Sequence, residues 1–154
     1  MNQRDSSIED GTDATTMPSV REPMTYYARV AGVAVPPGYS HAVAAARPVL
    51  VAVAGQVSLD ADGAIVGAGD FGAQVARALA NLVSVLAAAG CTPADVLKLT
   101  HFVVGLDGLR LAAVRAARDR VFRNERPASS LIGVASLASP AALYEVEALA
   151  ARDA

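Results

Sequence analysis

Two glutamates near the end of the chain have the type and spacing for proton transfer. Glu145 and Glu147 are separated by one residue within an apolar segment, residues 143–150. In a β-strand they would lie on the same face, roughly 7 Å apart. A carboxylate on an apolar wall suits general acid or base chemistry near neutral pH. We take Glu145 as the catalytic candidate, and the alternative is that either carboxylate pairs structurally with a nearby lysine or arginine.

Four other polar side chains are candidates for binding or catalysis. His101 lies in an apolar, strand-like segment, where a histidine is usually a hydrogen-bonded core residue but can also titrate near physiological pH. His41 follows a Pro-Gly turn and is a better-placed candidate. Ser129 and Ser130 offer adjacent hydroxyls, although no spacing identifies a Ser-His-Asp nucleophile. With two histidines and one cysteine, a zinc site would have to recruit carboxylates, so we expect no metal.

A glycine-rich segment, residues 67–72, fits the G-x-G-x-x-G pattern and precedes a helix-like stretch. A dinucleotide site also needs a full βαβ unit and an acidic residue about 20 positions later. The strand before this segment is very short, the acidic residue is missing, and the carboxylate of Asp70 would repel phosphate. We therefore expect no nucleotide and no other cofactor.

The composition predicts one soluble globular domain. The chain has 154 residues, of which 53% are hydrophobic and 18% charged, with a formal net charge of -2. No basic excess is present to attract a phosphate backbone, so we expect no nucleic-acid partner. Charged residues interrupt the richest apolar region, and the chain start lacks a signal-peptide pattern. A single cysteine fits a reducing compartment. We expect a cytoplasmic protein with no membrane partner.

The elements that must position these residues can be read from periodicity. Residues 1–22 are polar and charged, which predicts a disordered N-terminal tail, with a short arm docked on a neighbouring subunit as the alternative. Residues 23–154 are predicted to form one domain. Strand patterns occupy residues 25–35, 49–53, 65–66, 96–104, 130–137 and 143–150. The 96–104 strand is predicted to place Leu97, Leu99, His101 and Val103 on one face.

Two helices are predicted between these strands. Asp70 is the N-cap of the first, which carries an apolar stripe through Leu86 and ends at Gly90. The second covers residues 109–122, with Arg118 on its mostly apolar side. The order of strands and helices predicts an α+β domain with a mixed sheet and both helices on one face.

Several short motifs occur together over about residues 24–150. Residues 37–43, Pro-Gly-Tyr-Ser-His-Ala-Val, resemble Gly-Pro-Tyr-Ser-Gln-Ala, and Ala-Gly-Gln at 54–56 resembles Ser-Gly-Gln. The helix at 74–90 resembles one containing Ala-Leu-x-Asn-Leu and ending Ala-Ala-Gly, and Pro-Ala-Ser-Ser at 127–130 is similar to Pro-Ala-Arg-Ser. A strand with Glu-Val-Glu-Ala follows. In order and spacing these motifs resemble the RidA/YjgF (endoribonuclease L-PSP-like) reactive-intermediate deaminase family.

The resemblance implies a chorismate-mutase-like α+β subunit, usually a homotrimer with pockets between subunits. Family members hydrolyse an imine or enamine, with an arginine holding the substrate carboxylate and a glutamate helping to position water. When the family pattern is carried over to this chain, Glu145 and Tyr39 are the catalytic candidates. Ser129 stands where the family has its arginine, and Ala54 and Leu131 replace a serine and a cysteine. A two-residue difference in length leaves Ala113 and Arg115 as the two candidates for the family's helix asparagine.

The altered motif predicts an enzyme for a small imine, enamine or enol-type intermediate, and not a standard amino-acid-imine deaminase. Arg126 and Arg115 are candidates to replace the missing cation. The expected substrate-binding set is Ser129, Ser130, His41, Gln56 and Arg115. The alternative is a catalytically silent trimer that binds a metabolite or has a regulatory role. Nucleic-acid cleavage, which is attributed to some members, is disfavoured by the acidic pI of about 5.6.

Overall fold

The computed structural model describes residues 24–27, 39–40, 42–45 and 49–154. The predicted tail, His41 and residues 28–35 of the first predicted strand lie outside the described residues. The elements in chain order are β1 (Thr25–Tyr27), β2 (Ala42–Ala44), β3 (Val49–Gln56), α1 (Phe71–Ala88), the 3₁₀ helix η1 (Pro93–Asp95), β4 (Val96–Val104), α2 (Gly108–Phe122), β5 (Ala128–Val134) and β6 (Tyr144–Arg152).

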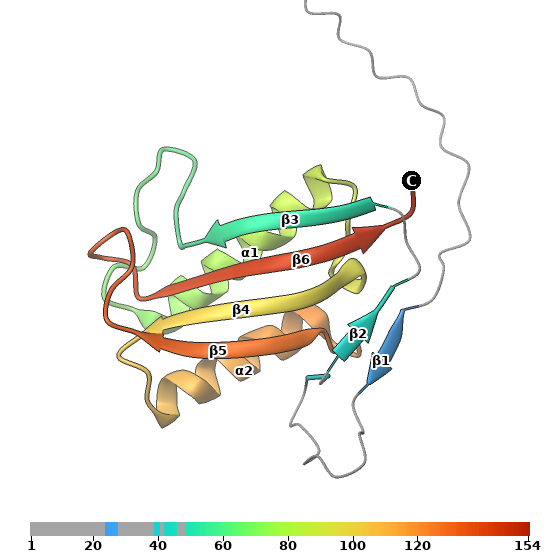
Figure 1. Ribbon diagram of the computed structural model, residues 1–154. Helices are drawn as coiled ribbons and strands as arrows, with labels where there is room; N and C mark the ends of the chain where they lie inside the picture. The colour runs from blue at the N-terminus through green and yellow to red at the C-terminus, as the bar shows by residue number, and fades with distance from the viewer. Residues whose placement is uncertain (1–23, 28–38, 41, 46–48) are drawn as a thin grey trace, which may run out of the picture.

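Four strands form a mixed sheet in the order β3-β6-β4-β5. Strand β6 pairs antiparallel with β3 and β4, whereas β4 and β5 are parallel. Parallel neighbours require a crossover connection, which α2 supplies. In Figure 1 both helices lie behind the sheet, and the face of the sheet that carries no helix is turned to the viewer. The predicted α+β architecture is confirmed. Strands β1 and β2 form a separate antiparallel pair near the start of β4 and β5.

Helix α1 forms where its cap and apolar stripe predict it. The Asp70 carboxylate accepts a hydrogen bond from the Ala73 N–H at 3.0 Å, and Gly90 follows the helix with a φ of 71°. By length and mean hydropathy α1 could cross a membrane. In this fold its stripe packs on β3 and β6, as the core helix of a soluble domain does. The buried residues of α1 are Gln74, Val75, Ala78, Leu79, Leu82 and Leu86.

Alternation along the strands separates two faces of the sheet, a helix face and an open face. On β4 and β6 the helix face carries the buried Leu99, His101, Val103, Tyr144, Val146 and Ala148. The open face carries Lys98, Thr100, Phe102, Glu145, Glu147 and Leu149. Glu145 pairs with Phe102, whereas Ser129 pairs with the buried Leu99. Ser129 therefore lies on the helix face and Glu145 on the open face.

Some local predictions are wrong. The predicted strand at 65–66 does not form, and Ile65 makes only an isolated bridge with Leu59. The turn predicted at residues 60–63 does form, because the Asp60 carboxylate accepts the N–H groups of residues 62 and 64. The chain turns again at residues 66–69, which leaves no length for a strand. Leu97 leaves the helix face because the register shifts between Val96 and Lys98, and Val96 is buried instead. Strand β2 has no counterpart among the predicted strands.

Candidate active site

A cavity between β5 and α2 collects several of the predicted site residues. Its volume is about 320 Å³, within the range of small-molecule sites. We call it the β5–α2 cavity. It is lined by Tyr39, His101, Leu106, Leu111, Val114, Arg115, Arg118, Ser129 and Leu131. Polar groups from three parts of the chain thus share one space with aliphatic walls.

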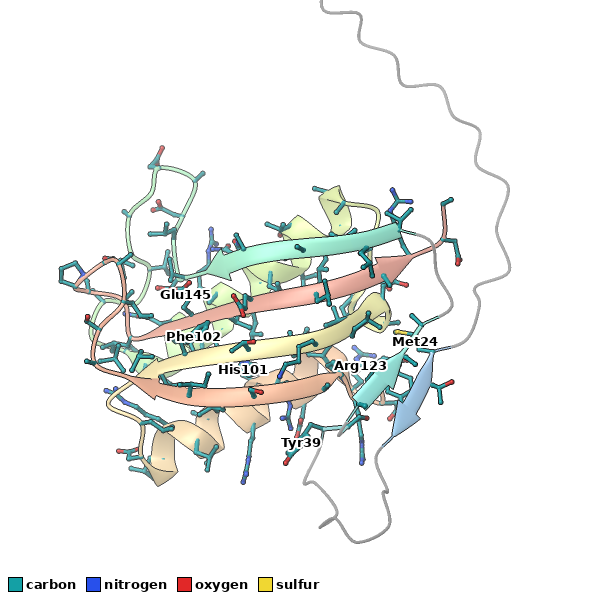
Figure 2. All side chains as sticks on the ribbon, viewed as in Figure 1. Met24, Tyr39, His101, Phe102, Arg123 and Glu145 are labelled. Atoms are coloured by element: carbon teal, nitrogen blue, oxygen red, sulfur yellow. The ribbon has the colours of Figure 1, made fainter. Side chains whose placement is uncertain are left out.

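Tyr39 reaches this cavity because the chain before β2 is attached to the start of β5. Ser40 forms an isolated parallel bridge with Ala128, and its N–H donates to the Pro127 carbonyl at 3.4 Å. This attachment holds Tyr39 beyond the β5 edge of the sheet (Figure 2). The phenol is half-buried and lines the cavity together with Ser129. The motif at 37–43 and the motif at 127–130 therefore meet in space.

His101 contributes a buried imidazole to the cavity wall. It is 1% exposed, and its Nδ1 lies 2.7 Å from the hydroxyl of Tyr144, which is also fully buried. Burial, together with the positive charges of Arg118 and Lys98, lowers the pKa of His101 to about 3. Burial also raises the pKa of the Tyr144 hydroxyl above its usual range. Both groups are neutral near neutral pH.

Two arginines from α2 line the same cavity, one turn apart. Arg115 is exposed, whereas Arg118 is 6% exposed and occupies the buried side of the helix with Val114 and Phe122. The Arg118 Nε and Nη2 both donate to one carboxylate oxygen of Asp119, at 3.1 and 2.9 Å. The side chain of Asp119 is 59% exposed. The cavity therefore carries positive charge from α2, although Ser129 supplies none from β5.

Glu145 stands apart from this cavity, on the open face. Its carboxylate lies directly over Gly55, so closely that a Cβ on residue 55 would be 1.7 Å from Oε1. Among the described residues it has no hydrogen-bond or ion-pair partner, so the predicted alternative of a structural ion pair is not found there. Figure 2 shows Glu145 on β6, well separated from Tyr39. The two predicted catalytic residues do not meet within one subunit.

The remaining predicted residues lie in other places. Ser130 faces the open side and accepts a hydrogen bond from the Lys98 Nζ at 2.5 Å. The Gln56 amide donates to the carbonyl of Ala54 in its own strand at 3.2 Å and lines a hollow next to α1. Of the described members of the predicted substrate-binding set, only Ser129 and Arg115 share the cavity with Tyr39. Within the described residues, no group of three His, Cys, Asp or Glu side chains is arranged to hold a metal ion.

The structure adds His101 and Arg118 to the cavity. His101 is a candidate from the sequence but is not in the predicted substrate-binding set, and Arg118 is not a predicted site residue. A signal for both exists in the sequence. Each is a polar residue at a position that periodicity assigns to the core, His101 on the apolar face of a strand and Arg118 on the apolar side of a helix. Buried polar residues of this kind require a partner or a function.

Comparisons with known proteins agree with this geometry. A family model described as endoribonuclease L-PSP matches residues 32–152. A RutC family protein of Haemophilus influenzae is 38% identical over 87 residues, which is 54% of this chain and 65% of that protein, just under two thirds of its length.

Solved structures give the same result. A protein of the conserved Rid family from Yersinia pestis is 43% identical, with a TM-score of 0.71 over 74% of this chain and 86% of that chain. A member of the YjgF/YER057c/UK114 family from Mycobacterium tuberculosis is 33% identical, with a TM-score of 0.57 over 84% of this chain and 99% of that chain.

Proposed function

Since the chain belongs to the endoribonuclease L-PSP family, to which the RidA/YjgF proteins belong, we propose that it is an enzyme for a reactive small-molecule intermediate. The substrate is an imine, enamine or enol-type compound, and the Glu145 carboxylate transfers the proton. The reaction is hydrolysis of the imine or a related acid-base step. Neither requires a metal or an organic cofactor.

The observation that carries this proposal is the position of Glu145. A carboxylate without a partner among the described residues, set over a glycine on the open face of the sheet, is available to a ligand. The absence of a Cβ at Gly55 leaves room for the carboxylate, and any larger residue would collide with it. A group of this kind within reach of a bound imine or water suits general acid or base catalysis.

We further propose that the complete site lies between subunits of a homotrimer. Glu145 and the β5–α2 cavity are on opposite faces of the sheet, so one subunit alone cannot present both to one small substrate. Apolar side chains on the open face support burial of that face against another copy of the chain. Leu50 is 65% exposed, Ile132 44% and Leu149 37%.

Ser129 stands where the family has an arginine, and this difference supports a substrate range that differs from that of arginine-bearing family members. An arginine at this position would offer a bidentate contact to a substrate carboxylate, whereas a serine hydroxyl offers one neutral hydrogen bond of about half the strength. We expect slow ammonia release from 2-iminopropionate relative to an arginine-bearing family member. Larger imines, whose apolar groups can fill the aliphatic part of the cavity, should be better substrates.

The test is Glu145→Gln, which keeps the shape of the side chain and removes its titratable group. Imines generated freshly from amino acids with apolar side chains serve as substrates, and released ammonia is measured. We expect turnover to fall by about 10²-fold or more. Glu147→Gln is the matched control, because Glu147 lies two residues away on the same face, and it should retain most of the activity. Wild-type turnover in Glu145→Gln would assign Glu145 a structural role.

A silent binding or regulatory trimer is the second candidate function, and the missing arginine favours it. In that case no imine in the panel would be turned over faster by the protein than by buffer, while a metabolite would still raise the melting temperature. A ligand screen by thermal shift, followed by product analysis on the best binders, separates the two functions.

A further inference from the structure

We propose that the β5–α2 cavity binds the carboxylate of a substrate with an apolar body, through the Arg118 guanidinium and the Nε2–H of His101. The inference rests on the proposed function in one respect, because it takes the occupant of the cavity to be the substrate. The cation then comes from α2, whereas the family pattern places it at the position of Ser129 on β5.

The first observation is the incomplete pairing of Arg118. Its Nε and Nη2 are used by Asp119, but Nη1 has no partner among the described residues. The Arg118 side chain is only 8% exposed and it lines the cavity. Nη1 is not one of the fully buried atoms without a partner, so a ligand that enters the cavity can reach it. An oxygen of a bound carboxylate would supply an acceptor.

The second observation is the orientation of His101. The Tyr144 hydroxyl is buried beside Nδ1, and the described residues offer it no other acceptor. We therefore assign the hydroxyl as the donor and Nδ1 as the acceptor, which places the ring proton on Nε2. That nitrogen is buried and has no partner. A buried N–H without an acceptor is uncommon in native proteins.

Nε2 is shielded from solvent when the cavity is empty, so binding includes a small movement of side chains in the wall. Among the side chains of the wall, we expect the exposed Arg115 to move, because it has no partner among the described residues to hold its long side chain. Burial keeps the pKa of His101 low, and the imidazole therefore acts as a neutral donor beside the positive charge of Arg118. Together they provide a cation and an aligned hydrogen bond for one carboxylate.

The rest of the wall defines the body of the ligand. Leu106, Leu111, Val114 and Leu131 are aliphatic, and the volume of about 320 Å³ exceeds what a two- or three-carbon acid would fill. An acid with a branched or aromatic group would bury apolar surface there and gain from it. The class of ligand is thus a medium-sized organic acid, and not a free phosphate or an acidic polymer.

Arg118 also has a purely structural interpretation, as the partner of Asp119. The pair with Asp119 explains two N–H donors of Arg118. It does not explain why the arginine is buried, because Asp119 itself is exposed. An ion pair with an exposed carboxylate forms equally well on the surface and contributes little stability. A bound carboxylate would explain why Arg118 lies in the cavity wall.

The experiment measures binding by calorimetry, with 3-phenylpropanoate and its neutral counterpart 3-phenylpropanamide as probes. We expect the full-length wild-type protein to bind the acid at least about tenfold more tightly than the amide. Arg118→Met should remove this preference. Arg120→Met is the matched control, since Arg120 lies on the same helix, is exposed and carries the same charge, and it should keep the preference. Equal affinity for acid and amide, or equal affinities in the two variants, would overturn the proposal.

A second measurement on the wild-type protein does not depend on whether Arg118→Met folds. The chain has two histidines, so the ¹⁵N signals of His101 can be assigned by comparison with His101→Gln. We expect the Nε2–H tautomer and a shift of Nε2 on adding the acid but not the amide. An unshifted Nε2 would contradict the proposed contact. Binding of the acid is measured without turnover, whereas the catalytic proposal is tested by ammonia release, so failure of the catalytic proposal and failure of the carboxylate site give different results.

Discussion

At the scale of single residues, burial decides what His101 can do. Its pKa is lowered to about 3 in the folded protein, while an unfolded chain has the ordinary value of 6.5. Between these two values the unfolded state binds a proton that the folded state does not, so the free energy of unfolding decreases as the pH falls below about 6.5. The decrease approaches about 1.4 kcal/mol per pH unit.

The comparison with His101→Gln isolates this effect, because glutamine does not titrate. Between pH 6.5 and 5 we expect the wild-type protein to lose about 1 to 2 kcal/mol more than the variant, measured by denaturant unfolding at one protein concentration. Both proteins retain their carboxylates and His41, which cancel in the difference. Parallel pH profiles would mean that His101 has nearly the same pKa in the folded protein as in the unfolded chain.

At the scale of elements, one side chain joins α1 to the loop that precedes β6. Gln74 is fully buried, and its amide donates to the carbonyls of Ala141 at 2.9 Å and Gly67 at 3.3 Å. Its carbonyl oxygen accepts the Leu143 N–H at 2.8 Å. These bonds fix where β6 begins, and β6 carries both Tyr144 and Glu145. The position of the site glutamate therefore depends on a polar residue inside the core.

Replacing Gln74 by Leu should destabilise the protein by about 2 to 4 kcal/mol, because it leaves buried backbone groups without partners. Chemical denaturation at fixed protein concentration measures this loss. Ser84→Ala is the control on the same helix, since Ser84 is exposed and bonds only within its helix, and it should change stability by less than about 0.5 kcal/mol. A small effect for Gln74→Leu would show that the loop is held by other contacts.

At the scale of the whole molecule, assembly determines whether the proposed site is complete. Light scattering at micromolar concentration should give the mass of three subunits. Leu149→Lys places a charge on the open face and should lower the mass, because a desolvated cation opposes burial of that face. Leu109→Lys is the control, since Leu109 is 83% exposed on α2, and it should leave the mass unchanged.

Two outcomes would contradict this assembly. A monomeric wild-type protein would remove the inter-subunit site and the catalytic role given to Glu145 with it. A trimer that survives Leu149→Lys would show that subunits meet through another surface. Binding of an acid in the β5–α2 cavity is independent of both outcomes, because Arg118 and His101 belong to the same subunit.

Several features of this protein follow from the sequence alone. Both helices lie where local patterns predict them, α1 directly after its predicted N-cap Asp70 and α2 over nearly the predicted residues 109–122, because capping and helical periodicity are local properties. Strand β4 has the predicted bounds for the same reason. The ordered motifs indicate the family, which the match over residues 32–152 confirms. Residues 65–66 show the limit of local patterns, since a turn at residues 66–69 leaves the predicted strand with a single bridge.

Other features are decided only by the tertiary structure. The register that pairs Ser129 with Leu99 and Glu145 with Phe102 puts these two site residues on opposite faces. Register depends on contacts between strands far apart in the chain, and a shift of one residue would reverse the faces. The buried environments of His101 and Arg118 likewise arise from tertiary packing, which sets α2 beside α1 behind the sheet. Periodicity predicts that a position is in the core, but only the packed neighbours determine whether a polar side chain there is satisfied or left open to a ligand.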